Sequence, residues 1–347
     1  MMYKKILSIL ISVVLILICF ASCGDNVSPI TKDVENLKLL RGLNLSGLEY
    51  RHRPLFYIDR KSVYEDIAQQ GFDHVRVPVD FRIYFNNEKG EFKKSFLNRL
   101  DNIINMANHE GLAVMLDFHG WSNFNVANGD TELFLSIWEK VAEHYKDYSN
   151  MLLFELINEP HTTEGGDLNM TNLMELQCKA IEKIRVISPD RTIVVATAEW
   201  NGTWTLKDFN PPAYDNLILA VHCYEPMDFT HQGQWWAGRA GTKESLTDEM
   251  LLGLYEHLDR IKEFKERTGM EVVLNEFGAI TTGIISDDDL YRFVSVITKY
   301  AEKNGFGWTY WEYNKEFGAY KKGFLGIGGE WREVMLDALF LRERKGE

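Results

Sequence analysis

The chain has 347 residues, of which 45% are hydrophobic and 26% charged, and this globular balance excludes a disordered or low-complexity protein. Its net charge of −13 excludes nucleic acid and an anionic membrane surface as good partners, because phosphate groups are bound by basic surfaces. The length fits either two ordinary domains or one α/β barrel.

Residues 1–22 have the features of an export signal. Lys4 and Lys5 precede an apolar run at 6–20, which is short for a membrane-spanning helix and typical of a signal peptide. Small residues then stand directly before Cys23, as in the lipidation motif of bacterial lipoproteins. We interpret 1–22 as a lipoprotein signal peptide, Cys23 as the lipidated residue and 23–36 as a polar tether.

This interpretation places the protein in the bacterial cell envelope, on the periplasmic or surface face of the outer membrane. The chain would touch the membrane only through the lipid on Cys23. An ordinary secretory signal cleaved near Ala21 or Ser22 is the alternative, and it would release the protein.

Eight short apolar runs predict parallel strands that are buried on both faces. They lie at 39–43, 74–77, 112–117, 152–156, 192–196, 217–221, 272–274 and 306–310. Amphipathic patterns between them predict helices at 96–110, 131–145, 173–187, 247–268 and 287–304. The count favours an α/β fold, a single (β/α)8 TIM barrel over 37–345, although an open doubly wound sheet has the same local alternation.

Helix ends are marked by polar caps and by glycines. Thr131 and Ser286 are predicted to be N-caps. Gly71, Gly111 and Gly305 stand where helices should stop before the next strand.

Two carboxylates, Glu159 and Glu276, follow the fourth and seventh predicted strands. Barrel closure would bring them to the same mouth, and a pair of carboxylates across a cleft is what glycosidic bond cleavage requires. Arg76 near one of them would hold it ionised, and the other, in a less polar place, would keep its proton near neutral pH.

Other polar or aromatic side chains stand at the ends of predicted strands: His119, Asn158, His222, Tyr224 and Trp311. Each one alone is more often a structural residue than a functional one. Polar groups at the mouth end of six of the eight strands favour a functional site.

No cofactor or metal is expected. Only Cys178 and Cys223 lie outside the export segment, and we expect both to be buried apolar fillers. His119, His222 and His231 lack the companion spacing of a zinc site.

Two segments resemble glycoside hydrolase family 5. Residues 153–161 (LFELINEPH) resemble its acid/base segment and 273–278 (VLNEFG) its nucleophile segment. Five more segments match in order, at 41–44, 71–78, 222–226, 229–233 and 308–312. Within the family the chain is most similar to compact bacterial β-1,4-endoglucanases, some of which also cleave mannan.

The resemblance implies hydrolysis with retention of anomeric configuration. Glu159 would be the general acid/base and Glu276 the nucleophile. Tyr224 would donate a hydrogen bond to Glu276, and Arg76 would keep Glu276 charged.

The same resemblance assigns the sugar contacts. Asn158 would bind the 2-hydroxyl, His119 would contact the sugar beside the nucleophile, His222 would orient Glu159, and Trp311 would form the platform beneath that sugar. The chain departs from the family at Gly120, where members often carry histidine or asparagine, and at Asn275, where many carry glycine.

Six tryptophans fall at or just after strand ends, where the flat faces of pyranose rings could pack on them. They are Trp121, Trp200, Trp204, Trp235, Trp236 and Trp311. Trp200 and Trp204 could equally plug the barrel mouth, and Trp138 and Trp331 are expected to serve packing.

The expected function is endo-acting hydrolysis of a β-1,4-linked glucan by a monomeric enzyme whose partner is a β-linked polysaccharide or oligosaccharide. Mannan, xyloglucan and mixed-linkage glucan stay open as substrates. A non-catalytic glycan-binding lipoprotein is the more distant alternative, and the presence of both Glu159 and Glu276 disfavours it.

Overall fold

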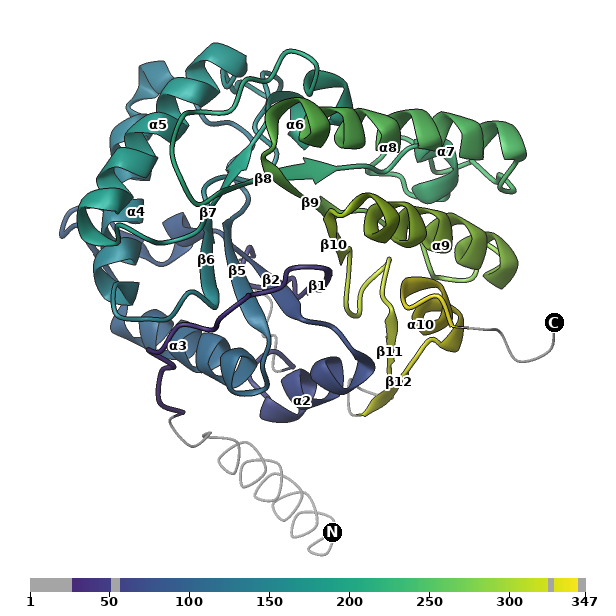
Figure 1. Cartoon of the computed structure of the whole chain (residues 1–347), viewed down its shortest axis with the longest axis horizontal. Helices are drawn as coiled ribbons and strands as arrows, with labels where there is room; N and C mark the ends of the chain where they lie inside the picture. The colour runs from purple at the N-terminus through teal and green to yellow at the C-terminus, as the bar shows by residue number, and fades with distance from the viewer. Residues whose placement is uncertain (1–26, 51–56, 324–327, 343–347) are drawn as a thin grey trace, which may run out of the picture.

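A closed barrel of eight parallel strands forms the centre of the molecule, with helices around its outside (Figure 1). The computed structural model describes residues 27–50, 57–323 and 328–342. The strand order is β1-β10-β9-β8-β7-β6-β5-β2, and β1 pairs with both β2 and β10. This confirms the (β/α)8 barrel.

The eight predicted runs each overlap one barrel strand. The strands are β1 (Arg41–Asn44), β2 (His74–Val79), β5 (Ala113–Phe118), β6 (Leu152–Glu155), β7 (Ile193–Ala196), β8 (Leu217–His222), β9 (Glu271–Glu276) and β10 (Gly307–Tyr310). Several end one or two residues later than predicted: polar residues extend β1, β8 and β9, and apolar residues extend β2 and β5.

The outer helices are α2 (Lys61–Gln70), α3 (Lys94–His109), α4 (Asp130–Tyr145), α5 (Met170–Ile187), α8 (Asp248–Thr268), α9 (Asp287–Asn304) and α10 (Glu333–Leu339). Sequence periodicity did not predict the small elements: β3 (Phe85–Asn86), β4 (Glu91–Phe92), α6 (Ala198–Asn201), α7 (Met227–Thr230), β11 (Tyr320–Lys322) and β12 (Gly329–Trp331). Among the described residues no helix has the length and apolarity needed to span a membrane.

The predicted helix ends are mostly confirmed. The Ser286 hydroxyl accepts from a backbone N–H in the first turn of α9. Left-handed glycines follow α2, α3 and α9: Gly71, Gly111 and Gly305. The Thr131 prediction is wrong, because Gly129 is the residue before α4 and the helix begins at Asp130.

The predicted tether meets the barrel. The signal peptide and Cys23 lie outside the described residues. From Val27 onward the chain lies against the barrel: the Asn105 amide donates to the Val27 carbonyl at 2.7 Å, and the Val34 N–H donates to Asn150 at 2.9 Å.

The barrel interior changes from apolar to polar along its axis. Small and aliphatic side chains fill one end: Ala113, Met115, Leu153, Val194, Ala220 and Val273. Toward the mouth the fully buried interior residues are charged or amide side chains, among them Arg76, Asp117 and Glu155. Buried polar side chains of this kind need hydrogen-bond or ion-pair partners inside the protein, because they are removed from water.

Two of the predictions about packing residues need correction. Trp121 is only 5% exposed and packs against Phe118 and Phe124, so it belongs to the core and not to a sugar platform. Cys223 is buried as predicted, whereas Cys178 is half-buried.

The entry to β1 crosses β10 so closely that only glycine fits. A Cβ on Gly307 would lie 1.9 Å from the backbone carbonyl oxygen of Leu39. A backbone atom cannot move aside as a flexible side chain can, so barrel closure at this seam depends on Gly307.

We predict that Gly307→Ala lowers the free energy of unfolding by about 1–3 kcal/mol through this overlap. Gly253→Ala is the matched control: it lies inside α8 with nothing within 4 Å of its Cβ. It should raise stability by roughly 0.5–1 kcal/mol. Urea unfolding of both variants checks this, and equal midpoints would contradict the account.

Candidate active site

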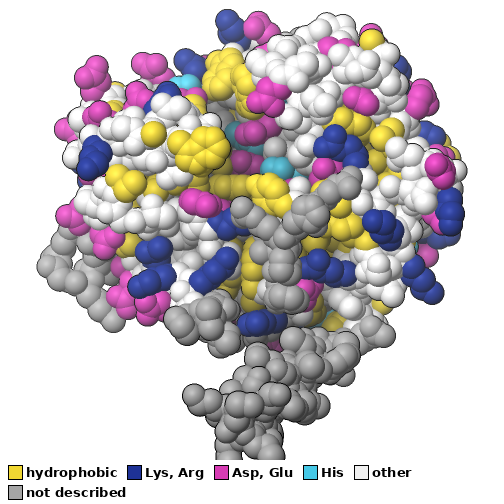
Figure 2. Space-filling model, turned by 180° about the vertical axis from the view of Figure 1, so that it is seen from behind, with side chains coloured by type: hydrophobic (Ala, Val, Ile, Leu, Met, Phe, Trp, Pro, Cys, Tyr) yellow, Lys and Arg dark blue, Asp and Glu magenta, His cyan; other side chains and the backbone are white. Residues whose placement is uncertain are grey.

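A cleft of about 970 Å³ opens at the carboxyl ends of the barrel strands. Glu159, Glu276, His119, His222 and Trp311 line it together. Figure 2 shows acidic and histidine side chains at the bottom of a hollow, bordered by hydrophobic side chains. The fold therefore brings these predicted residues, which are distant in sequence, to one place.

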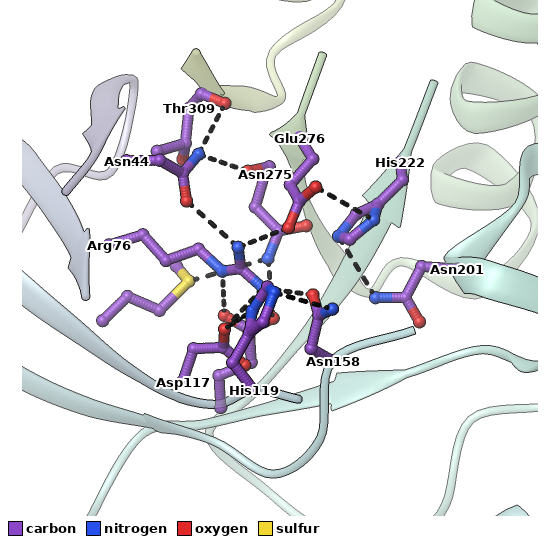
Figure 3. Close-up of polar contacts among 12 residues, drawn as sticks. Asn44, Arg76, Asp117, His119, Asn158, Asn201, His222, Asn275, Glu276 and Thr309 are labelled. Atoms are coloured by element: carbon purple, nitrogen blue, oxygen red, sulfur yellow. Dashed lines mark hydrogen bonds and ion pairs between the residues drawn. The ribbon is translucent and has the colours of Figure 1, made fainter. Parts of the chain in front are cut away.

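Arg76 is the fully buried centre of the polar layer beneath the cleft (Figure 3). Its guanidinium contacts Glu276 at 2.6 Å, Glu155 at 2.7 and 2.9 Å, and Asp117 at 2.9 Å. Burial opposes its charge, but the three carboxylates outweigh that effect and raise the pKa of Arg76 well above its ordinary value.

Glu276 at the end of β9 is held at both oxygens. Arg76 binds Oε1, and the Tyr224 hydroxyl donates to Oε2 at 3.0 Å. The side chain is 6% exposed. This carboxylate is therefore hydrogen-bonded at both oxygens and fixed in direction.

Glu159 follows β6 and is far more open, with 31% of its side chain exposed. The Nδ1 atom of His222 lies 2.9 Å from Glu159 and 3.7 Å from Glu276. One carboxylate oxygen of Glu159 lies within 4.8 Å of one of Glu276. The two predicted carboxylates thus face each other across His222.

The surroundings of Glu159 differ from the apolar environment that we expected. Burial raises its pKa, but the hydrogen bond and charge of His222 outweigh burial and lower it below the ordinary value. The same pairing raises the pKa of His222 against its own burial. The pairing therefore favours the ionised form of Glu159 and the protonated form of His222.

His119 stands on the opposite side of the polar layer. Its Nδ1 lies 2.7 Å from Asp117, and its ring stacks on Trp311 at 5.9 Å between centroids. Burial would favour the neutral ring, but the charge of Asp117 dominates and raises the pKa of His119 to about 9.

Asn158 is buried with its Oδ1 accepting from Arg76 at 2.7 Å. Its amide nitrogen lies 3.4 Å from Nε2 of His119. Arg76 thereby fixes the amide with its nitrogen beside a residue that lines the cleft.

Sequence reasoning missed the supports of Arg76. Asp117 and Glu155 were not chosen as site residues, and Asn275 was noted only as a departure from the family. The Asn275 amide donates a hydrogen bond to Glu155 at 2.8 Å, so it helps to hold the carboxylate that pairs with Arg76. A charged residue inside an otherwise apolar strand was the available signal.

A second missed group lines the cleft near Trp311. Lys315 lies 3.2 Å from Glu49 and 3.8 Å from Glu312, and the Ser46 hydroxyl donates to Glu312. Burial, partly offset by Lys315, raises the pKa of Glu312 to about 7. This end of the cleft is polar.

Aromatic side chains line other parts of the cleft: Trp200, Trp204, Trp235 and Trp236. Trp200 and Trp204 are 37% and 40% exposed, so they do not plug the mouth as core residues. Trp138 and Trp331 pack against the core as predicted, and Trp331 lies in β12.

Two groups of donor side chains in the described ranges are close enough to share a cation: Glu159, His222 and Glu276, and Cys223, Glu225 and His257. Arg76 already occupies Glu276, and a guanidinium repels a cation at the same carboxylate. In the second group Arg260 lies 3.4 Å from Nδ1 of His257. The positive neighbours favour proton chemistry over metal binding in the first group.

We predict a pH-dependent stability that comes from His119. Its pKa rises from 6.5 to about 9 on folding, so its stabilisation is complete below pH 6.5 and is lost as the pH rises through 9. The difference in free energy of unfolding between wild type and His119→Gln should shrink by roughly 3 kcal/mol from pH 6 to pH 10. Chemical unfolding at a series of pH values measures it, and parallel curves would refute the assignment.

Comparison with known proteins agrees with this site. The family model "Cellulase (glycosyl hydrolase family 5)" matches residues 32–317. Cellodextrinase A of Ruminococcus flavefaciens is 28% identical over 289 residues, which are 77% of this chain and 83% of that protein. The clostridial cellulose synthase subunit Z of Clostridioides difficile has a TM-score of 0.79 and 30% identity, over 87% of this chain and 99% of that one.

Cel5A of Thermotoga maritima in complex with cellobiose gives a TM-score of 0.78 at 29% identity, over 87% of this chain and 97% of that chain. The same enzyme has also been solved with mannotriose, at a TM-score of 0.78. The family match covers most of the chain, and the barrel and its cleft agree with it. The chain belongs to glycosyl hydrolase family 5 and is a glycoside hydrolase.

Proposed function

We propose that the chain hydrolyses internal β-1,4 bonds of a glucan by a double displacement with retention. Glu276 attacks the anomeric carbon, and Glu159 gives a proton to the departing glycosidic oxygen. Water then attacks the glycosyl-enzyme while Glu159 takes a proton from it.

The separation of the two carboxylates is the observation that carries the proposal. One oxygen of Glu159 lies within 4.8 Å of one of Glu276. Retaining enzymes hold their carboxyl groups about 5–5.5 Å apart, whereas inverting enzymes leave about 6.5–9.5 Å for a water molecule. The short gap supports retention.

The environments of the two residues support their different roles. Arg76 and Tyr224 hold Glu276 in the fixed direction that a nucleophile needs. Glu159 is partly exposed to the cleft, so a bound sugar would cover it and raise its pKa toward that of an acid. Once Glu276 becomes an ester its negative charge disappears, which lowers the pKa of Glu159 and leaves Glu159 ionised and ready to act as a base.

Three further residues are suited to hold the sugar beside Glu276. Asn158 is fixed by Arg76 and is placed to donate to the 2-hydroxyl, a contact that strengthens in the transition state. Trp311 offers its ring as the platform, and the stacked, protonated His119 faces the same sugar.

The substrate class rests on the relatives. Their names are cellodextrinase and endoglucanase, and Cel5A was crystallised with cellobiose, which favours β-1,4-glucan. The mannotriose complex of Cel5A favours β-mannan as the second candidate. Exposed tryptophans in the cleft suit either chain, because both present flat C–H faces.

Product release from carboxymethylcellulose, lichenan, xyloglucan, glucomannan and galactomannan tests the proposal. Wild type should give ladders of oligosaccharides, and the best polymer identifies the substrate. Glu276→Gln should lose activity by at least about 10⁴-fold, since it removes the nucleophile. Folded wild type that is silent on every polymer would overturn endo action.

Glu159→Ala separates the acid role from the nucleophile role. Hydrolysis of polymer should fall by roughly 10²–10⁴-fold. Release of 2,4-dinitrophenol from the matching aryl disaccharide should fall far less in its first step, because this leaving group needs no proton. Full polymer activity in Glu159→Ala would show that another group supplies the acid.

We also propose that the chain is exported and anchored through a lipid on Cys23, which follows the apolar run at 6–20. Bacterial cells that express it and are fed radiolabelled palmitate should yield a labelled, membrane-bound enzyme. Cys23→Ser should abolish both the label and the membrane fraction. Unlabelled wild type in the medium would indicate an ordinary secretory signal.

A further inference from the structure

Three consecutive non-glycine residues beside the acid/base adopt the left-handed conformation. Glu199, Trp200 and Asn201 have φ angles of 52°, 58° and 55°. Single left-handed residues are uncommon, and Asn is the one of these three that tolerates the region well. A run of three persists only where its surroundings fix it, as happens at functional sites.

The surroundings fix this turn on both sides. The Trp200 N–H donates to the carbonyl of Pro160, the neighbour of Glu159, at 3.2 Å, and the Trp200 ring stacks on His161. Gly202 forms a bridge to His222, and a Cβ there would lie 2.4 Å from the Trp204 ring. The turn therefore places Asn201 at a defined position behind His222.

Asn201 is completely buried, and its amide faces the ring of His222 (Figure 3). The ring nitrogen that it faces is Nε2, whereas Nδ1 faces Glu159. Its Nδ2 lies 3.4 Å from Nε2 of His222. Its Oδ1 is buried and has no hydrogen-bond partner. An unpaired buried carbonyl oxygen beside a histidine that can carry two protons is a costly arrangement unless the oxygen has a use.

We propose that Asn201 is a positioning residue that controls the protonation of His222, and through it of Glu159, by presenting either its N–H or its carbonyl oxygen to Nε2. When Nε2 lacks a proton, the amide N–H can donate to it, an arrangement that the 3.4 Å separation of Nδ2 and Nε2 allows. When Nε2 gains a proton, a half-turn of the amide brings Oδ1 to accept it. The inference rests on the proposed acid/base role of Glu159.

Charged groups facing His222 come from two other strands and from the loop after β6. Glu159 and Glu276 face Nδ1, and Arg76 acts from β2. Because Glu159 and His222 share a proton, the pH profile reports the pair and not either residue alone. A permanent hydrogen-bond acceptor at position 201 would raise the pH at which the Glu159–His222 pair loses its proton. It would also hold that proton on His222, from which it cannot be transferred to the leaving group.

Asn201→Asp is the main test, since Asp has the same size and also tolerates the left-handed conformation. The alkaline limb of kcat/KM on the preferred oligosaccharide should move up by about one pH unit, with a maximum about tenfold lower. The first step on the 2,4-dinitrophenyl glycoside, which needs no acid, should change less than about twofold. If Asn201 had a purely structural role, the substitution would lower the rates on both substrates by the same factor and would leave the alkaline limb at the same pH.

Asn201→Gly is the second variant, because it removes the amide and relieves the backbone. Its alkaline limb should move to lower pH, opposite to Asn201→Asp. Limbs unmoved in both variants would overturn the proposal.

Nitrogen-15 NMR of His222 in the wild-type chain needs no substitution. At a pH high enough for the ring of His222 to be neutral, its proton should lie on Nδ1, and a neutral ring protonated on Nε2 would overturn the proposal. Glu159→Ala with full activity would instead defeat the proposed function, and the NMR readout of His222 in the wild-type chain would still stand.

Discussion

The contact on which the rest of the site depends is the buried guanidinium of Arg76 among Glu276, Glu155 and Asp117. Three carboxylates at the closed mouth of a barrel repel one another, and removal of their shared partner would leave charges buried without compensation. Four different strands meet at this contact, so it forms only when the barrel closes. The chemistry of the site and the closure of the fold are therefore coupled.

The layer around Arg76 separates two carboxylates of the same chemical type. Glu276 is bound by Arg76 and Tyr224, whereas Glu159 lies in the open cleft with His222 as its one charged hydrogen-bond partner among the described residues. The environment of Glu276 holds its carboxylate in place, and the environment of Glu159 allows that carboxylate to gain and lose a proton. Covering of Glu159 by substrate and the left-handed turn behind His222 both act on that second environment, which makes proton placement the adjustable part of the site.

Sequence pattern predicted the barrel because its strands are buried on both faces and read as apolar runs, with Glu159 and Glu276 at their ends. It missed Asp117 and Glu155, since residues inside a strand give no sign of which partner they meet. Trp121 was misplaced because position after a strand does not fix whether a ring turns inward. The environment of Glu159 and the role of Asn201 depend on loop backbone angles, which side-chain periodicity does not encode.

The most direct test of the two-carboxylate site is the anomeric form of the first product. Proton NMR of cellotetraose, or of the best oligosaccharide found, can follow the new reducing end before mutarotation mixes the anomers. The carboxylate spacing predicts that the β-anomer appears first and the α-anomer grows in later. An α-anomer that appears first would mean inversion, and Glu276 would then be a base that activates water and not the nucleophile.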